Sequence, residues 1–203
     1  MSYLTNWGYT LTDAESLADI ISVEEFNTMT AGRYSGDVRI PSGIASASLA
    51  LRNFCGWHLS ESFACKISWT VTNRGIIRHG PDVTIQLPTR FLTAINSISI
   101  AGEEFTDFSF QVNGLLTLYD VPRFNRRDVI EVEYTAGISD ASAIKDMVSQ
   151  MVTLTLAKSY GVTSEAAGGV SVTYNSAWTN GSFSHILENN MALLAPYRLE
   201  GVF

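Results

Sequence analysis

The chain has 203 residues, of which 46% are hydrophobic and 16% are charged, and its formal net charge is −7. The length fits one domain, or one domain with a sizeable insertion. The acidic balance argues against tight binding of DNA or RNA, because such binding uses lysine and arginine to displace phosphate counterions. A surface that DNA passes without binding remains compatible with this charge.

The charged fraction is below the roughly 25% usual for soluble globular domains, which favours self-association. The sequence contains no run of 18 apolar residues and does not begin with a basic and then apolar segment. We therefore expect no membrane span, synthesis in the cytoplasm, and two reduced cysteines, Cys55 and Cys65.

Two capping-box patterns near the N-terminus, Thr12-Asp-Ala-Glu15 and Ser22-Val-Glu-Glu25, each predict a short helix. We expect Gly32 to end the second helix. The side chains expected to be buried are Leu17, Ile20 and Ile21 in the first helix, and Phe26 and Met29 in the second.

Two longer amphipathic helices are predicted further along the chain. The first starts near Pro41, which suits an initial helical position, and continues to about Ser60. The second covers Asp140 to Tyr160 and is ended by Gly161. It contains only three charged residues, so we expect it to be covered on more than one side, by the rest of the chain or by neighbouring copies. Its apolar stripe consists of Ile144, Met147, Val148, Met151, Val152, Leu154, Ala157 and Tyr160.

Between these helices the hydrophobic pattern alternates with a period of two, which predicts five to seven antiparallel strands in residues 64–136. The dipeptide Asn113-Gly114 is the strongest hairpin signal. We therefore expect an α+β fold, in which this β-domain is inserted into a helical core formed by residues 1–63 and 137–203. A possible strand at 170–174, a short helix ended by Pro196 and an extended C-terminal arm complete the chain.

Residue chemistry points to no catalytic, cofactor or metal site. The three histidines, His58, His79 and His185, lie in different predicted elements, and the cysteines lack the paired spacing of a zinc site. Cys55 and His58 are three residues apart on one helix face, so a thiol–imidazole pair is geometrically possible. A buried, unreactive thiol is the more common arrangement.

Arg123, Arg126 and Arg127 cluster in the segment between Val121 and Asp128. Such a cluster usually belongs to a solvated loop. The alternative is a contact with phosphate or with a partner protein.

The order of several short motifs resembles the head–tail connector (adaptor) proteins of long-tailed bacteriophages, especially those of actinobacterial hosts. The main motif is Ala47-Ser-Leu-Ala-Leu-Arg-Asn-Phe-Cys-Gly-Trp-His58, at the end of a predicted long helix. The motifs that follow it are Val83–Thr89, Ile95–Gly102, Phe110–Leu116, Ile130–Gly137 and Leu193–Arg198. The resemblance extends from about residue 22 to residue 203.

This resemblance implies a structural virion protein at the head–tail junction, or neck. It implies a ring, typically of twelve copies, that docks beneath the portal protein, continues the DNA channel without binding DNA specifically, and seats a stopper or tail-completion protein. No catalysis is implied. The C-terminal residues Tyr197, Arg198, Leu199, Val202 and Phe203 would then form a docking arm for the portal or a neighbouring copy. Two alternatives remain: a tail terminator or stopper of the neck, and an enzyme that uses Cys55 and His58.

Overall fold

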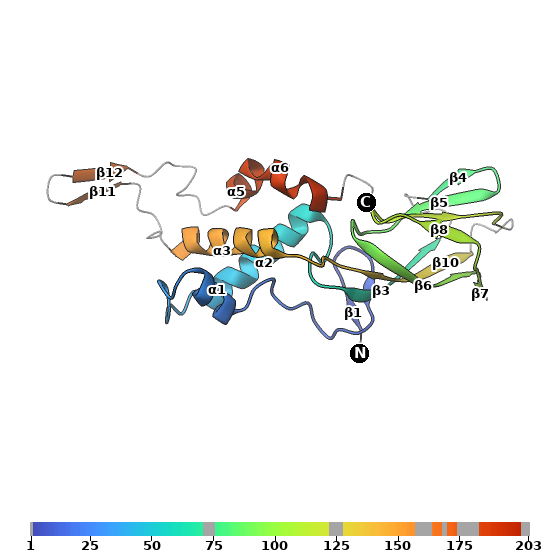
Figure 1. Cartoon of the computed structure of the whole chain (residues 1–203), viewed down its shortest axis with the longest axis horizontal. Coiled ribbons are helices and arrows are strands. Elements are labelled where there is room, and N and C mark those ends of the chain that lie inside the picture. The colour runs from blue at the N-terminus through green and yellow to red at the C-terminus, as the bar shows by residue number, and fades with distance from the viewer. Residues whose placement is uncertain are drawn as a thin grey trace. The chain divides into compact units, whose positions relative to one another are not determined.

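The computed structural model describes residues 2–70, 76–121, 128–156, 164–167, 170–173 and 183–199, and it confirms the α+β class (Figure 1). The chain divides into two compact units. One comprises Met1–Ala18, Cys55–Ser139 and Pro196–Phe203, and the other comprises Asp19–Phe54 and Asp140–Ala195. The first 18 residues and the last eight thus group with the strands, whereas the sequence analysis grouped them with the helices.

The β-rich unit is built on three long antiparallel strands, β3 (Phe63–Thr70), β10 (Val129–Ala136) and β6 (Leu92–Ile100), with β10 in the centre. The short strands β1 (Tyr3–Leu4) and β2 (Thr10–Leu11) extend this sheet beside β3, and β7 (Glu103–Glu104) extends it beside β6. Buried and more accessible residues alternate along β10, as expected for a sheet with one covered face.

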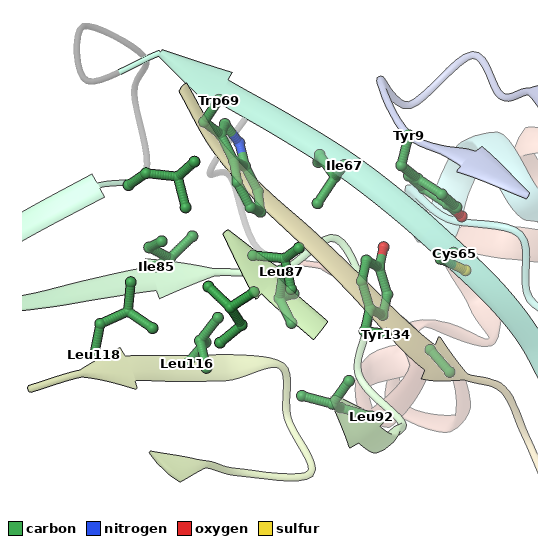
Figure 2. Packing of buried hydrophobic residues seen from close by; sticks show 14 of the residues in the cluster. Tyr9, Cys65, Ile67, Trp69, Ile85, Leu87, Leu92, Leu116, Leu118 and Tyr134 are labelled. Carbon is green, nitrogen blue, oxygen red and sulfur yellow. The ribbon is translucent and has the colours of Figure 1, made fainter. Parts of the chain in front are cut away.

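A second sheet has the order β4 (Ile76–His79), β5 (Asp82–Gln86), β9 (Leu115–Leu118) and β8 (Phe108–Phe110). The strands β8 and β9 flank Asn113-Gly114, which confirms the predicted hairpin. The described residues between Phe63 and Ala136 contain eight strands, so the predicted five to seven is too low; the sequence pattern missed the short strands β4 and β7. Apolar side chains from both sheets form one core, which Figure 2 shows from close by; it includes Ile67, Trp69, Ile85, Leu87, Leu116, Leu118 and Tyr134.

The helical unit contains α1 (Val23–Met29), α2 (Ile40–Cys55, whose last residue falls in the β-rich unit) and α3 (Ser142–Leu156). Both predicted long helices are present, but α2 ends at Cys55 and not near Ser60, because Gly56 takes a left-handed φ of +82°. His58 therefore lies beyond the helix, and the predicted helix face shared by Cys55 and His58 is wrong. The stripe predicted for α3 is buried from Ile144 to Val152, but Leu154 is only half-buried. Ala157 and Tyr160 lie outside the described residues. At Gly43 of α2 an added Cβ would lie 3.3 Å from a methyl group of Val152, so the absence of a side chain lets the two helices approach closely.

The capping box at Ser22 is present as predicted. The hydroxyl of Ser22 accepts from the amide of Glu25 at 3.1 Å, and the carboxylate of Glu25 accepts from the amide of Ser22 at 2.8 Å. The Nζ of Lys145 in α3 donates to the same carboxylate at 2.7 Å and so ties α3 to α1. Phe26 is buried as expected, but Met29 is 40% exposed, so its predicted burial is wrong.

The helix predicted after Thr12 is wrong, because residues 12–21 contain no helix. Both the amide and the hydroxyl of Thr12 donate to the carbonyl of Ala64, at 2.9 and 3.2 Å. Pairing with the start of β3 therefore takes the amide hydrogen that the side chain of Glu15 would accept in a capping box. Ile20 and Ile21 are still buried, and Ser48 of α2 accepts from the amide of Ile20.

The last elements are β11 (Ser164–Ala167), β12 (Val170–Thr173), α5 (Ser184–Asn189), α6 (Met191–Leu194) and the 3-10 turn η1 (Ala195–Tyr197). The strands β11 and β12 pair with each other in an antiparallel hairpin. The single short helix predicted before Pro196 is interrupted at Asn190, and it buries Leu187 and Leu194.

Within the described residues, no helix is both long enough and apolar enough to cross a membrane.

Candidate functional site

The C-terminal segment that the sequence analysis singled out lies against the β-rich unit. The indole Nε1 of the fully buried Trp57 donates to the carbonyl of Tyr197 at 2.6 Å. The ring of Phe91 lies between the two residues, with its centroid 5.8 Å from that of Trp57 and 5.5 Å from that of Tyr197. Tyr197 is therefore held by its contact with the ring of Phe91 and by one partly buried hydrogen bond.

The next two residues are held through their backbone. The Nε of Arg90 donates to the carbonyl of Arg198 at 2.9 Å, and the amide of Leu199 donates to the carbonyl of Cys55 at 2.9 Å. Gly56, which has a φ of +82°, lies beneath Leu199, and an added Cβ would approach that side chain to 3.6 Å. We call residues 197–199 the C-terminal strap.

Three of the five residues predicted to form the docking arm thus lie together in the C-terminal strap. The other two, Val202 and Phe203, lie outside the described residues. Trp57, Arg90 and Phe91, which hold the strap, were not predicted as site residues. The only signal in the sequence is the position of Trp57 just after a long helix, and it does not reveal a contact with a residue 140 positions later.

The arginines predicted as a possible partner contact, Arg123, Arg126 and Arg127, all lie outside the described residues. Their neighbours Val121 and Asp128 are described, so the arginines lie in the connection between β9 and β10.

The outer face of the larger sheet is polar and predominantly acidic. The Nζ of Lys66 lies 3.3 Å from Glu133 and 3.5 Å from Glu131, and Ser68 donates to Glu131 at 3.1 Å. The hydrogen bond to Glu133 raises the pKa of the Lys66 amino group. Glu104 extends the row, because it pairs with Ser99 next to Glu131. With three carboxylates and one ammonium, these residues give the face a net negative charge.

Cys55 and His58 do not form a catalytic pair. Burial raises the pKa of the Cys55 thiol to about 12, against a smaller opposing effect of the Arg198 charge. The ring nitrogens of His58 are engaged elsewhere: Nδ1 lies 2.7 Å from the hydroxyl of Tyr9, and Nε2 lies 3.2 Å from the carbonyl of Ala136. A carbonyl only accepts, so Nε2 carries the hydrogen. The Tyr9 hydroxyl also accepts from the His58 amide at 2.9 Å, so Tyr9 contacts both the ring and the backbone of His58.

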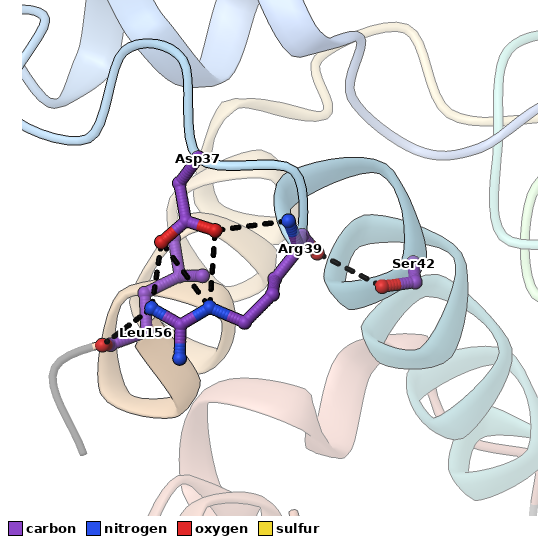
Figure 3. A network of polar contacts seen from close by, with 4 residues as sticks. All are labelled: Asp37, Arg39, Ser42 and Leu156. Atoms are coloured by element: carbon purple, nitrogen blue, oxygen red, sulfur yellow. Dashed lines mark hydrogen bonds and ion pairs between the residues drawn. The ribbon is translucent and has the colours of Figure 1, made fainter. Parts of the chain in front are cut away.

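At the start of α2, Arg39 connects this helix to α3 (Figure 3). Its guanidinium forms two-pronged contacts with Asp37, the shortest of 2.6 Å, and its Nη2 also donates to the carbonyl of Leu156 at 3.4 Å. The Arg39 guanidinium holds the pKa of the Asp37 carboxyl at about 2. This arrangement fixes the junction of two helices and offers no reactive group.

No group of three or more potential metal ligands comes together among the residues that the structure describes.

A comparison with protein-family models finds a match to the family described as head completion protein, over residues 19–198. A search of curated proteins finds no significant relative. The family match includes residues of both compact units.

Proposed function

The chain belongs to the head completion protein family, and on that basis we propose that it is the adaptor of a bacteriophage neck. In this role it forms a ring, of about twelve copies by its resemblance to head–tail connectors, and docks beneath the portal. Its work is structural and requires no cofactor. The observation that carries the proposal is the family match, because it extends over nearly the whole chain.

The charge distribution supports a channel that DNA traverses without being held. The chain has a net charge of −7, and the outer face of its larger sheet presents Glu104, Glu131 and Glu133 around Lys66. A surface of this sign does not release counterions from phosphates and therefore lacks the main source of nonspecific DNA affinity. DNA can therefore slide past this acidic surface.

We propose that the C-terminal arm contacts the portal or a neighbouring copy, and that the arginines at 123, 126 and 127 contact a partner at another surface. The contacts of the C-terminal strap decide which C-terminal truncation can test this contact. Removal of residues 196–203 would delete the acceptor of Trp57 and the donor to Cys55, so it would perturb the fold as well as the arm. Removal of residues 200–203 alone leaves the strap in place.

The test is co-purification with the portal protein of the same phage, followed by electron microscopy of the complex. We expect a twelve-fold ring of this chain on the portal, and loss of binding when residues 200–203 are removed. Tyr119→Phe, a change at an exposed tyrosine of the β-rich unit, serves as a matched control and should bind normally. A six-fold ring would instead identify a stopper or tail terminator, and no binding to any neck component would refute the proposal.

A further inference from the structure

The sequence contains two Asn-Gly pairs, Asn113-Gly114 and Asn180-Gly181, and the structure describes the first of them. Asparagine followed by glycine is especially prone to spontaneous deamidation, because no side chain shields the backbone nitrogen of the glycine. That nitrogen attacks Cγ of the asparagine side chain and expels ammonia, which carries away the proton of the amide. Water then opens the cyclic imide to aspartate or to isoaspartate, so the reaction consumes no reagent other than water.

Two hydrogen bonds engage the groups of Asn113-Gly114 that would react. The amide of Gly114 donates to the carbonyl of Gln111 at 3.0 Å, so the nitrogen that would attack is part of the turn. Oδ1 of Asn113 accepts from the amide of Leu115 at 3.2 Å, which fixes the side chain. Both bonds oppose the attack, because the nitrogen has to leave its acceptor and Cγ has to turn toward the nitrogen.

The neighbouring strand fixes the turn from the other side. Nε2 of Gln86 on β5 donates to the backbone carbonyl of Asn113 at 2.9 Å and to that of Leu87 at 3.1 Å. The amide of Leu87 donates to the carbonyl of Gly114 at 2.8 Å. At Gly114 an added Cβ would lie 2.4 Å from the carbonyl oxygen of Thr89, so the turn lies directly against this segment and has little room to change its backbone conformation.

The side chain of Asn113 is nevertheless on the surface, so water reaches it and a local opening of the turn is enough for the reaction. We propose that Asn113 is a site of deamidation that the folded hairpin keeps closed, with Gln86 as the residue that limits its opening. The inference does not depend on the proposed function.

The isoaspartate product would disturb the same contacts. It adds one methylene group to the backbone between residues 113 and 114, where the turn lies against the carbonyl of Thr89. The residues that follow Thr89, Arg90 and Phe91, hold the C-terminal strap. A chain that forms isoaspartate while it is unfolded therefore cannot regain the native turn, and Asn113 records the time that the chain spends unfolded.

The experiment measures deamidation at Asn113 by mass spectrometry of its peptide, in the native full chain and in the same chain unfolded in urea, at equal pH and temperature. We expect the reaction to be at least about tenfold slower in the native chain, because it waits for a local opening of the turn. In urea, Asn113 and Asn180 should react at similar rates, since both are followed by glycine.

A pair of variants tests the part played by Gln86. Gln86→Ala removes the donor to the turn, so we expect deamidation of Asn113 in the native chain to become about threefold faster or more, with no change in urea. Thr84→Ala is the matched control, because Thr84 lies two residues earlier on β5 and pairs with Thr117 instead of the turn. It should leave the native rate unchanged, and circular dichroism confirms that both variants are folded.

Three results would overturn the inference: equal rates at Asn113 in the native and the unfolded chain, no reaction at Asn113 in urea, or an equal response to Gln86→Ala and Thr84→Ala. The first comparison uses the unmodified chain, so it decides the matter even where a variant fails to fold.

Discussion

Replacement of Gly137 by alanine tests the junction at which the central strand of the larger sheet ends. An added Cβ would lie 2.4 Å from both the Cα and the N of Ser62, and 2.5 Å from the carbonyl carbon of Glu61. These are backbone atoms and cannot rotate away. The strand end is itself fixed, because the amide of Gly137 donates to the carbonyl of Phe91 at 3.0 Å and the amide of Ile138 donates to that of Ser60 at 2.9 Å.

Relief of this overlap requires the two backbone segments to separate by about 1 Å, which places the change at the upper end of the roughly 1–3 kcal/mol that overpacking usually costs. We expect the free energy of unfolding to fall by about 3 kcal/mol. For a chain of this length each kcal/mol lowers Tm by about 2–4 °C, so the expected decrease is about 6–12 °C.

Thermal unfolding followed by circular dichroism, together with urea unfolding, measures both quantities. Gly102→Ala is the matched control: it has a φ of +87° but nothing within 4 Å of an added Cβ. Its cost is limited to left-handed backbone strain, about 1–2 kcal/mol. If Gly137→Ala destabilises the protein no more than Gly102→Ala, the close approach of Gly137 to residues 61 and 62 is refuted.

Three further predictions follow from single contacts. Trp57→Phe keeps an aromatic ring but leaves the carbonyl of Tyr197 without its donor. We expect the free energy of unfolding to fall by about 1–3 kcal/mol and amide exchange at residues 197–199 to become faster. Unchanged exchange at these residues would show that the hydrogen bond does not hold the strap. Asp37 has a folded pKa of about 2, below its ordinary 3.8, so its pairing with Arg39 stabilises the fold above about pH 4 and this contribution is lost as the pH falls through 2. The difference in Tm between the wild type and Asp37→Asn should therefore be present at pH 7 and vanish near pH 2. A difference in Tm that persists near pH 2 would rule out the ion pair as its cause. Because burial raises the pKa of both native thiols to about 12, a maleimide at pH 7.5 should label neither cysteine in the native chain and both after unfolding; rapid labelling of native Cys55 would revive the enzymatic alternative.

Short sequence patterns predicted the local structure correctly where their residues interact only with near neighbours in the chain. The capping box at Ser22 and Glu25 is complete within four residues, and the turn at Asn113-Gly114 joins two adjacent strands. The same capping pattern failed at Thr12 because Ala64, 52 residues away, takes both donors of that residue. A sequence pattern contains no information about such a competitor.

The candidate site shows the same limit. The resemblance to head–tail connectors marked the C-terminal arm as a contact region, but the anchor of this arm combines Trp57, Arg90 and Phe91 with residues more than 100 positions later. The exclusion of a reactive Cys55 also depended on distant groups, since Tyr9 and Ala136 occupy the ring nitrogens of His58. Spacing placed the thiol and the imidazole on one helix face and gave no indication of these partners.

The hydrogen-bond partners of His58 and Trp57 determine how the β-rich unit can be isolated. A fragment limited to residues 55–139 would keep both side chains and nearly all the strands, yet it would lack the hydroxyl of Tyr9 and the carbonyl of Tyr197. Two buried polar groups would then have lost their partners at the centre of the excised piece. Anyone who wishes to study this half of the molecule by itself must supply three separate stretches of polypeptide, through a permuted chain or by co-expression, because no single uninterrupted stretch contains them all.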